Sequence, residues 1–437
     1  FKQKTAYEIR LSLVGSEMCI RDRYGRPFME KKLMTTHKHD FEPVILSGAR
    51  TPVGKFLGGL ATQTAAQLGQ VAVRAAVERA GIDAGDVSEV ILGNVVSAGV
   101  GQALPRQVSI GAGVPAHVGG VAINKVCGSG LKAVMIAANA IKAQDGDVYI
   151  AGGTESMSQA PFLLRDHRTG YKYGKTELVD ALQNDGLWCH LCDWSMGNAA
   201  EFVGRQLEVT RAEMDALAYA SHINAQAATT EGRFKAEIVP VTIPGKKGDT
   251  VIDRDESIRP ETTLEALAKL KPAFEENGAV TAGNAPGMND GSAAVIVSSR
   301  AYAERKGIKP LARVVAYGQA AVEPEWLFYA PVKAIPVALA RAGWTMDDVD
   351  LFEVNEAFAA QVMANVKGLA RDGHRLPLEK LNVNGGAIAL GHPIGASGTR
   401  VLVTLIYALQ QRGLKRGIAA LCLGGSEGVA FAVELED

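Results

Sequence analysis

AAVERAGIDAGDVSEVILGN, residues 75–94, and VALARAGWTMDDVDLFEVNE, residues 337–356, are two copies of one sequence pattern. Each copy runs from a helical segment to an Arg-Ala-Gly stop, a short loop, an Asp-Val pair and an apolar strand. The copies match at one constant offset, which pairs Arg79 with Arg341, Ala80 with Ala342, Gly81 with Gly343, Asp86 with Asp348, and Val87 with Val349. Such an internal repeat predicts two similar α/β halves packed together.

The repeat belongs to a chain in which strands and helices alternate. Apolar runs rich in β-branched residues predict buried strands at 43–49, 89–96, 148–153, 293–299, 312–318, 351–357 and 417–425. Helical periodicity predicts helices ending at glycine at 64–81, 130–144, 331–343 and 398–413. This alternation is typical of an α/β fold with parallel or mixed sheets. The region from about 159 to 288 is richer in charge and predicts an inserted, loop-rich domain.

Composition excludes several classes of protein. The 437 residues are 47% hydrophobic and carry a formal charge of −1, without a basic stripe, so nucleic acid is not an expected partner. No apolar run reaches the about 20 residues that cross a bilayer, so we expect a soluble protein without a membrane partner. Five cysteines in a chain of this length do not form a disulfide framework, which predicts a reducing, cytoplasmic location.

The first 33 residues do not fit the rest of the chain. FKQKTAYEIRLSLVGSEMCIRDR, residues 1–23, lacks the apolar core and cleavage site of a signal peptide. MCIRDR resembles the translation of a sequencing adaptor. We therefore expect residues 1–33 to be a non-native or disordered extension, with a native start at Met29 or Met34, and we leave Cys19 out of the functional argument. The alternative is a natural extension, and an organellar targeting segment could be hidden here.

One cysteine lies between a strand-like run and a helical one, in INKVCGSGLKAV, residues 123–134. The amino end of a helix stabilises a thiolate, so Cys127 is a candidate nucleophile. Gly128 and Gly130 would let a substrate carbonyl approach the backbone closely. The alternative is a small buried cysteine with no chemical role.

A histidine lies among glycines in NVNGGAIALGHPIGASGTR, residues 382–400. Its position before a helix that begins near Ser397 makes His392 a candidate catalytic base or donor, although single histidines are more often structural. The glycine spacing does not match the G-x-G-x-x-G dinucleotide-binding pattern.

Two further stretches carry candidate chemistry. Cys422 stands at a strand end in LCLGGSEG, residues 421–428, which repeats the placement of Cys127 and predicts one site shared by both halves. Asn355 and Glu356 end the second repeat's strand in VNEAFAAQ, residues 354–361, where Asn could hold a water and Glu could orient a neighbour. The alternative is ordinary capping of the following helix.

Together with GGTESMSQAP (152–161) and TAGNAPGMNDG (281–291), these stretches resemble the thiolase family from about Pro43 to Glu436. The resemblance implies the thiolase fold, an α/β fold in which two βαβαβαββ halves form a five-layer αβαβα arrangement with an inserted loop domain. The implied boundaries are 40–158 with 289–309 for the N-terminal half, 159–288 for the inserted CoA-binding domain, and 310–437 for the C-terminal half.

The resemblance also implies a role for each candidate. Cys127 would carry the acyl group, and His392 would help to form its thiolate and later stabilise the enolate oxygen. Cys422 would move the α-proton of acetyl-CoA. Asn355 would hold a water that joins His392 in one oxyanion hole, while the backbone N–H groups of Cys127 and Gly424 would form the other. The implied reaction is the reversible ping-pong condensation of two acetyl-CoA molecules to acetoacetyl-CoA and CoA.

Coenzyme A would enter as substrate, with no permanently bound cofactor and no metal. The positions that resemble the family's CoA pocket are Leu187, Met196, Arg259, Phe274, Ala282 and Phe358. The family also implies a homodimer or homotetramer with a role in fatty acid metabolism.

The chain departs from the family at a few positions. Ser195, Pro286 and Ala266 replace a histidine and two serines that are frequent there, and Ser426 interrupts a frequent glycine triplet, which leaves the acyl preference open. WCHLCDW, residues 188–194, contains a C-x-x-C pair that we expect to be loop packing rather than a metal or redox site. The alternative functions are a degradative 3-ketoacyl-CoA thiolase of broader chain length, a ketoacyl synthase, which Cys422 argues against, and a catalytically silent CoA-thioester-binding protein.

Overall fold

The computed structural model describes residues 39–436. The predicted extension, residues 1–33, lies outside these residues, as does Cys19. No helix within the described range is long and apolar enough to cross a membrane.

Sixteen strands are present in the described chain: β1 (Pro43–Arg50), β2 (Gly54–Lys55), β3 (Glu89–Gly93), β4 (Gly119–Ile123), β5 (Val148–Ser156), β6 (Phe162–Leu163), β7 (Val179–Asp180), β8 (Trp188–Cys189), β9 (Trp194–Ser195), β10 (Val241–Ile243), β11 (Thr250–Ile252), β12 (Asn289–Ser299), β13 (Ala312–Ala321), β14 (Leu351–Val354), β15 (Arg416–Leu423) and β16 (Glu427–Leu435).

The α-helices are α2 (Ala65–Ala80), α3 (Leu104–Gly111), α4 (Ser129–Lys142), α5 (Met196–Gln206), α6 (Arg211–Thr230), α7 (Leu264–Ala268), α8 (Arg300–Lys306), α9 (Ala330–Ala342), α10 (Ala359–Arg371), α11 (Ala387–Leu390) and α12 (Ser397–Arg412). Short 3₁₀ or π segments are η1 (Ala84–Asp86), η2 (Met157–Gln159), η3 (Arg165–Arg168), η4 (Leu182–Leu187), η5 (Pro324–Tyr329) and η6 (Leu378–Lys380).

The main sheet is mixed and contains strands from both halves. Its order is β14-β15-β16-β13-β1-β12-β5-β3-β4, with β2 paired to β12. The pairs β3/β4, β3/β5 and β14/β15 are parallel, and the other pairs are antiparallel. The two halves meet where β1 pairs with β13 over only two residues, Val44 and Ile45. Because this pairing is so short, the sheet divides there into one sheet for each half.

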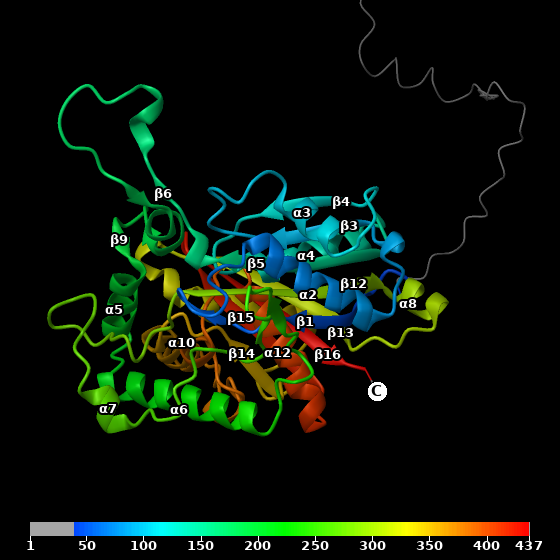
Figure 1. The fold of residues 1–437 in the computed structure, drawn as a ribbon. Coiled ribbons are helices and arrows are strands. Elements are labelled where there is room, and N and C mark those ends of the chain that lie inside the picture. Colours follow the sequence, from blue (N-terminus) through cyan, green and yellow to red (C-terminus); the bar gives the residue numbers. More distant parts are fainter. Residues whose placement is uncertain (1–38, 437) are drawn as a thin grey trace, which may run out of the picture. The chain divides into compact units, whose positions relative to one another are not determined.

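The layers follow from which side chains pack together (Figure 1). Alternate residues of a strand point to opposite faces, so each sheet contributes to two clusters. Residues of α4 and α12 pack between the two sheets in one large cluster. Residues of α2 and α3 cover the outer face of the first sheet, and residues of α9 and α10 cover the outer face of the second. The five-layer αβαβα arrangement predicted above is therefore confirmed.

The repeat appears as matching structure. Helices α2 and α9 both end at a glycine in the left-handed region, Gly81 at φ 64° and Gly343 at φ 70°, as the Arg-Ala-Gly stop predicts. The strand that follows each copy, β3 or β14, pairs in parallel with the strand that follows the central helix, β5 or β15. The two central helices therefore begin at equivalent places, and their amino ends are where the candidate residues cluster.

Several predicted boundaries were wrong. The strands predicted at 351–357 and 417–425 end at Val354 and Leu423. The strand predicted at 89–96 ends at Gly93, because the N–H groups of Val95 and Val96 donate to the Glu155 carboxylate instead of a neighbouring strand. The helix predicted at 130–144 does not end at glycine; its cap is Ala143, and Gln144 takes the left-handed conformation at φ 63°.

The segment between β5 and β12 leaves and rejoins the sheet at adjacent positions, since Ser156 lies opposite Asp290. It is less irregular than expected. Helix α5 and the long helix α6 both begin with capping boxes, at Ser195 with Asn198 and at Thr210 with Glu213. Figure 1 shows the chain around β6 and β7 projecting outward from this segment.

Candidate active site

A cavity of about 400 Å³ brings together residues from both halves and from the inserted segment. Cys127, His392, Cys422 and Gly424 all line it, although they lie far apart in the sequence. Its walls are largely apolar, and its other lining residues are Met157, Gln183, Gly186, Leu187, Ser195, Met196, Gly197, Phe274, Ala285, Pro286, Gly287, Met288, Phe328, Ala357, Phe358 and Ile394.

Cys127 is held in a sharp turn directly before α4. The preceding residue, Val126, has a φ of 46°, which is strained for a β-branched residue. The Ser129 hydroxyl fixes this turn, because it accepts from the N–H of Lys125 at 2.8 Å and donates to the carbonyl of Val126 at 2.7 Å. A side chain at Gly128 would collide with Leu423, with a Cβ only 2.1 Å from its nearest atom. A side chain at 128 would therefore displace the Leu423 side chain at the end of β15.

The Cys127 thiol is protonated in the resting protein. Burial raises its pKa to about 12, and hydrogen bonds from the N–H groups of Gly424 and Cys127 oppose that shift. The two N–H groups thus favour a thiolate, but burial raises the pKa by more than they lower it. The same two N–H groups are those predicted to bind an oxyanion, and both already face the sulfur.

His392 is a buried, neutral imidazole. Burial, with a smaller contribution from Arg400, lowers its pKa to about 3. Its backbone N–H donates to Asn289 at 2.8 Å, and its Nδ1 lies 2.6 Å from the Ser397 hydroxyl. Its Nε2 is buried and has no hydrogen-bond partner among the described residues. A ring fixed at one nitrogen and free at the other is suited to exchanging a proton with a group in the cavity.

Cys422 occupies the end of β15 and is completely buried. Burial, followed by the neighbouring Cys127, raises its pKa well above the usual value. Cys127 and Cys422 line the same cavity, so the two thiols are neighbours. Their places in the repeat are not equivalent, because Cys422 ends the strand that follows α12, whereas Cys127 precedes α4.

Asn355 lies beside this group but does not line the cavity. Its N–H donates to Ala420 on β15 at 2.9 Å. The side chain is fully buried, yet neither Oδ1 nor Nδ2 has a partner within residues 39–436. A buried amide without partners costs about 1–3 kcal/mol, so a bound water is the expected partner.

This arrangement agrees with comparisons to known proteins. Residues 43–301 match the thiolase N-terminal domain, and residues 308–435 match the thiolase C-terminal domain. The chain belongs to the thiolase family. It is 51% identical to an acetyl-CoA acetyltransferase of Cupriavidus necator over 392 residues, which cover 90% of this chain and 98% of the relative. It is also 51% identical to one of Syntrophomonas wolfei over 396 residues, which cover 90% of this chain and 99% of the relative.

Solved thiolase structures superpose closely. The crystal structure of the Bacillus anthracis acetyl-CoA acetyltransferase matches with a TM-score of 0.88 and 41% identity, over 92% of this chain and all of that one. The structure of the Syntrophomonas wolfei acetyl-CoA acetyltransferase matches with a TM-score of 0.89 and 42% identity, over 90% and 99% of the two chains.

Four of the six predicted CoA-pocket positions in this thiolase line the cavity: Leu187, Met196, Phe274 and Phe358. The Phe358 ring packs against Phe274 at 6.0 Å and Phe328 at 5.5 Å between ring centroids. Arg259 and Ala282 do not line the cavity, and both are exposed to solvent. They could therefore contact only a part of coenzyme A that lies outside it.

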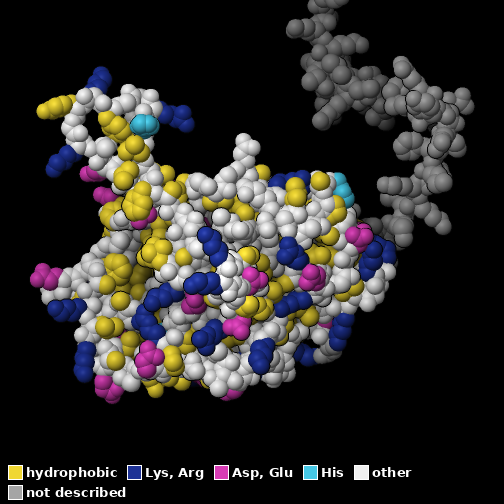
Figure 2. Space-filling model, in the orientation of Figure 1, with side chains coloured by type: hydrophobic (Ala, Val, Ile, Leu, Met, Phe, Trp, Pro, Cys, Tyr) yellow, Lys and Arg dark blue, Asp and Glu magenta, His cyan; other side chains and the backbone are white. Residues whose placement is uncertain are grey.

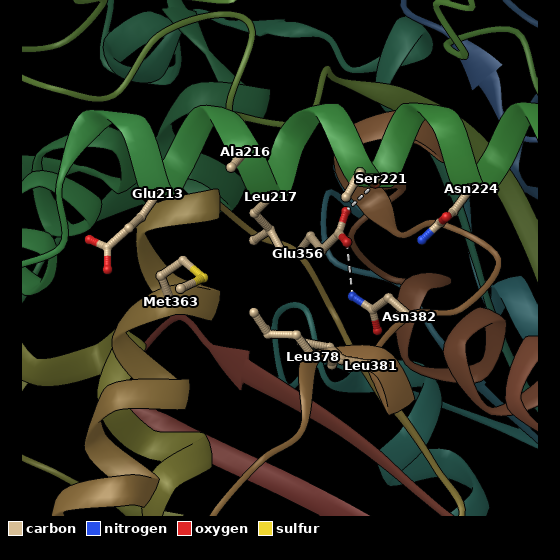
Figure 3. Close-up of a pocket in the computed structure, with 11 residues that line it drawn as sticks. Glu213, Ala216, Leu217, Ser221, Asn224, Glu356, Met363, Leu378, Leu381 and Asn382 are labelled. Atoms are coloured by element: carbon tan, nitrogen blue, oxygen red, sulfur yellow. Dashed lines mark hydrogen bonds between the residues drawn. The ribbon is translucent and has the colours of Figure 1, made fainter. Parts of the chain in front are cut away.

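Glu356, the neighbour of Asn355, faces a second cavity of about 400 Å³ between α6 and α10 (Figure 3). Its carboxylate accepts from Ser221 at 2.7 Å, Asn382 at 2.9 Å and the N–H of Ile388 at 3.1 Å. Glu356 therefore orients neighbours, as predicted. It joins the segment that follows β14, which contains Asn355, to the loop that leads to His392.

Sequence reasoning missed two residues that hold the site. Ser397 was predicted only as a helix start, yet it holds the imidazole. Glu155, within GGTESMSQAP, lies at the end of β5. It accepts hydrogen bonds from Asn94 at 2.9 Å and from the N–H of Gly395 at 2.9 Å, in addition to Val95 and Val96. Glu155 thereby links the loops of both halves. Glu155 lies between Gly153 and the helical turn η2, and this stretch carries no periodic pattern that would have revealed its role.

The Ser397 hydroxyl has one proton and two acceptors within reach. It donates to the carbonyl of Pro393 at 2.9 Å, and Nδ1 of His392 is the other neighbour. When the proton points to Pro393, the ring carries its proton on Nδ1 and Nε2 is a base. When the hydroxyl turns to Nδ1, the Nε2 position is a donor. One serine therefore accommodates either neutral tautomer of His392.

Replacing Ser397 by alanine is expected to lower kcat about 10- to 100-fold with little change in KM. A buried N–H without its acceptor costs about 1–3 kcal/mol, and about 1.4 kcal/mol is a factor of ten. The measurement is steady-state cleavage of acetoacetyl-CoA together with thermal unfolding. Ser109→Ala is the matched control, since that buried hydroxyl donates only to Arg106 within α3. A wild-type kcat for Ser397→Ala would contradict the assigned role.

Proposed function

We propose that the protein catalyses the reversible condensation of two acetyl-CoA molecules to acetoacetyl-CoA and CoA. The observation that carries this proposal is the convergence of Cys127, His392 and Cys422 on one apolar cavity. Carbon–carbon bond formation needs one sulfur to hold an acyl group and a second group to remove a proton from the next substrate. Two adjacent thiols beside one imidazole meet that need.

In the first half-reaction Cys127 attacks the thioester carbonyl of acetyl-CoA while its proton passes to Nε2 of His392. Because both groups are neutral at rest, the proton moves as the attack proceeds, and no charge has to be maintained in the buried cavity. The N–H groups of Cys127 and Gly424 would stabilise the tetrahedral oxyanion. The carbon–sulfur bond of the substrate then breaks, and CoA leaves with the proton from His392.

In the second half-reaction Cys422 would pass its proton to Nε2 of His392, and the thiolate of Cys422 would then remove a proton from the α-carbon of a second acetyl-CoA. The enolate oxygen would bind Nε2–H of His392 and the water held by Asn355. The α-carbon attacks the acetyl carbonyl on Cys127, and the bond from this carbonyl to sulfur breaks. Acetoacetyl-CoA forms, and Cys127 leaves as a thiolate that takes up the proton from His392.

The inserted segment, 159–288, is the proposed CoA-binding domain. Its residues supply one wall of the cavity, including Leu187, Met196 and Phe274. The aliphatic arm of the coenzyme would pack against this wall. Arg259 is exposed, and its guanidinium would meet a phosphate outside the cavity; Ala282 would lie beside the same part of the coenzyme.

Two surfaces support a proposed homodimer or homotetramer. Strand β4 ends the sheet, and no strand of the described chain pairs with its outer edge. Its residues are largely exposed, including Val121. The chain around β6 and β7 also exposes large hydrophobic side chains, namely Phe162, Leu164, Tyr171, Tyr173 and Leu178 (Figure 2). A free sheet edge and an apolar projection both favour association with further copies.

A cytoplasmic location and a role in fatty acid metabolism complete the proposal. The four cysteines of the described chain, Cys127, Cys189, Cys192 and Cys422, are free thiols. This state fits a reducing compartment.

The purified protein is expected to cleave acetoacetyl-CoA when CoA is added, measured as loss of the absorbance of the 3-ketoacyl thioester. A panel of 3-ketoacyl-CoA substrates of increasing length then gives kcat/KM for each. We expect a preference for acetoacetyl-CoA. A peak at longer chains would favour the degradative alternative, whose support is the smaller Ser195 in place of a histidine. Binding without turnover would identify a silent CoA-thioester-binding protein.

A further inference from the structure

Cys189 and Cys192, which the reaction does not use, lie on one tight hairpin. Strands β8 and β9 pair with Trp188 opposite Ser195 and Cys189 opposite Trp194. Residues 190–193 form the turn, in which Asp193 takes the left-handed conformation at φ 55° and accepts from the Trp188 indole at 3.2 Å. Residues three apart in a tight turn bring their Cα atoms within about 7 Å, which is the range of a disulfide.

The two cysteines are neighbours on this hairpin. Burial, the charge of the Cys189 sulfur and a hydrogen bond to its thiol raise the pKa of Cys192 to about 11. Both cysteines pack into the same apolar cluster, next to Trp194 and Met196. The cluster provides no further ligand for a metal, because the described residues hold no group of three His, Cys, Asp or Glu side chains suited to one.

The two sulfurs differ in access. Cys189 is only 4% exposed, whereas Cys192 is partly open to solvent beside the exposed Leu191. An oxidant can reach Cys192 first, and Cys189 lies behind it. Access to solvent for one thiol and a second thiol beside it are two features of a reacting and resolving pair. The raised pKa of Cys192 keeps its thiolate fraction small near neutral pH, so the reaction is expected to be slow there.

The hairpin forms part of the wall of the acyl-CoA cavity. Leu187 precedes β8, Ser195 ends β9, and Met196 begins α5; all three line the cavity. Any bond across the turn therefore restrains the wall on both sides of the hairpin.

We propose that Cys189 and Cys192 are a redox-reactive dithiol, which peroxide oxidises to a disulfide that stiffens the cavity wall and weakens the binding of CoA thioesters. The Cys192 thiolate attacks one oxygen of hydrogen peroxide, the O–O bond breaks, and the hydroxide that leaves takes up the thiol proton to give water. Cys189 then attacks the sulfur of the Cys192 sulfenic acid, the S–S bond forms, and a second water leaves. Two thiols lose two electrons, and one peroxide becomes two waters.

The first test detects formation of the disulfide and needs no measurement of enzyme activity. A full-length Cys127→Ala protein is treated with hydrogen peroxide, digested without reduction and mapped by mass spectrometry. The peptide that contains both cysteines is expected to lose two hydrogen atoms, at a rate that rises with pH because the thiolate reacts. Fluorescence of Trp188 and Trp194 should change in step, and Cys192→Ser should abolish both changes. If an alkylating reagent still labels both thiols completely after this treatment, no disulfide has formed and the proposal is overturned.

The second test measures how oxidation changes substrate binding in the cavity, and it rests on the proposed function. Wild-type and Cys192→Ser proteins are oxidised in the same way, and KM for acetoacetyl-CoA is measured. Oxidation of Cys127 lowers kcat in both proteins but leaves the KM of the surviving fraction unchanged. KM is expected to rise about three- to tenfold in the wild type only. An equal KM would overturn the link to the cavity. If the protein shows no turnover, calorimetric binding of CoA replaces KM, so failure of the proposed function remains distinguishable.

Discussion

Replacing Cys127 by alanine is expected to abolish cleavage of acetoacetyl-CoA, with a loss in kcat of at least about four orders of magnitude. Removal of a covalent nucleophile leaves only the catalysis that binding and oxyanion stabilisation supply. The fold should persist, because alanine fits where cysteine was and the turn is held by Ser129 rather than by the thiol. The measurement is the cleavage rate of protein purified from a host that lacks its own thiolase.

The control for this variant is Cys189→Ala, which removes a buried thiol that does not line the cavity. It should keep activity close to that of the wild type. Labelled acetyl-CoA gives an independent reading, since the wild type should retain label on the peptide that contains Cys127 and the variant should not. An active Cys127→Ala protein, or label on another residue, would refute the assignment of the nucleophile.

Replacing Cys422 by alanine is expected to separate the two half-reactions. Condensation and cleavage should fall about 10²- to 10⁴-fold, the range that a general acid or base contributes. Transfer of acetyl from acetyl-CoA to Cys127 and on to labelled CoA should stay within about tenfold, because His392 and the two N–H groups serve that step. Condensation and cleavage depend on Cys422 because it is buried at the end of β15 next to Cys127, where the second substrate must lose its proton.

Two rates are measured in the same preparation of Cys422→Ala: the exchange of acetyl onto labelled CoA and the cleavage of acetoacetyl-CoA. Cys422→Ser is a useful companion, since a hydroxyl keeps the size of the group but is a much weaker acid. Equal losses in exchange and cleavage would show that Cys422 supports the cavity rather than moving a proton. Intact condensation from a malonyl thioester without cleavage would favour the ketoacyl synthase alternative.

The overall architecture could be predicted because its determinants are local and repeated. The Arg-Ala-Gly stop marks the end of α2 and of α9, and apolar runs mark the buried strands on either side of the central helices. The repeat then requires the two halves to have the same connections. The inserted segment was harder to predict. Its charge indicated a loop, and the capping boxes that begin α5 and α6 were not recognised.

The candidate site was predicted in part for a similar reason. Cys127 and His392 stand next to glycines, and Cys422 lies two residues before one, at strand ends or helix starts, where a pattern is visible. Ser397 and Glu155 act through single hydrogen bonds across long sequence distances, such as Glu155 to Gly395, and no local pattern reports such a bond. The unpartnered amide of Asn355 is a property of burial, which only coordinates reveal. The assignment of chemical roles remains a prediction that the variants above test.

The inserted segment has a consequence for how members of this family can differ. It leaves the sheet after Ser156 and returns at Asp290, which lie opposite each other on adjacent antiparallel strands. Its length therefore places no constraint on the register of the sheet. Its sequence does touch the site, since Ser221 on α6 binds Glu356 and the N–H of Gly386 on the loop that leads to His392. The segment is therefore a cassette that can be exchanged as long as this serine is kept. Grafting a relative's version between the same two junctions would transplant one wall of the chamber, and with it the acyl selectivity.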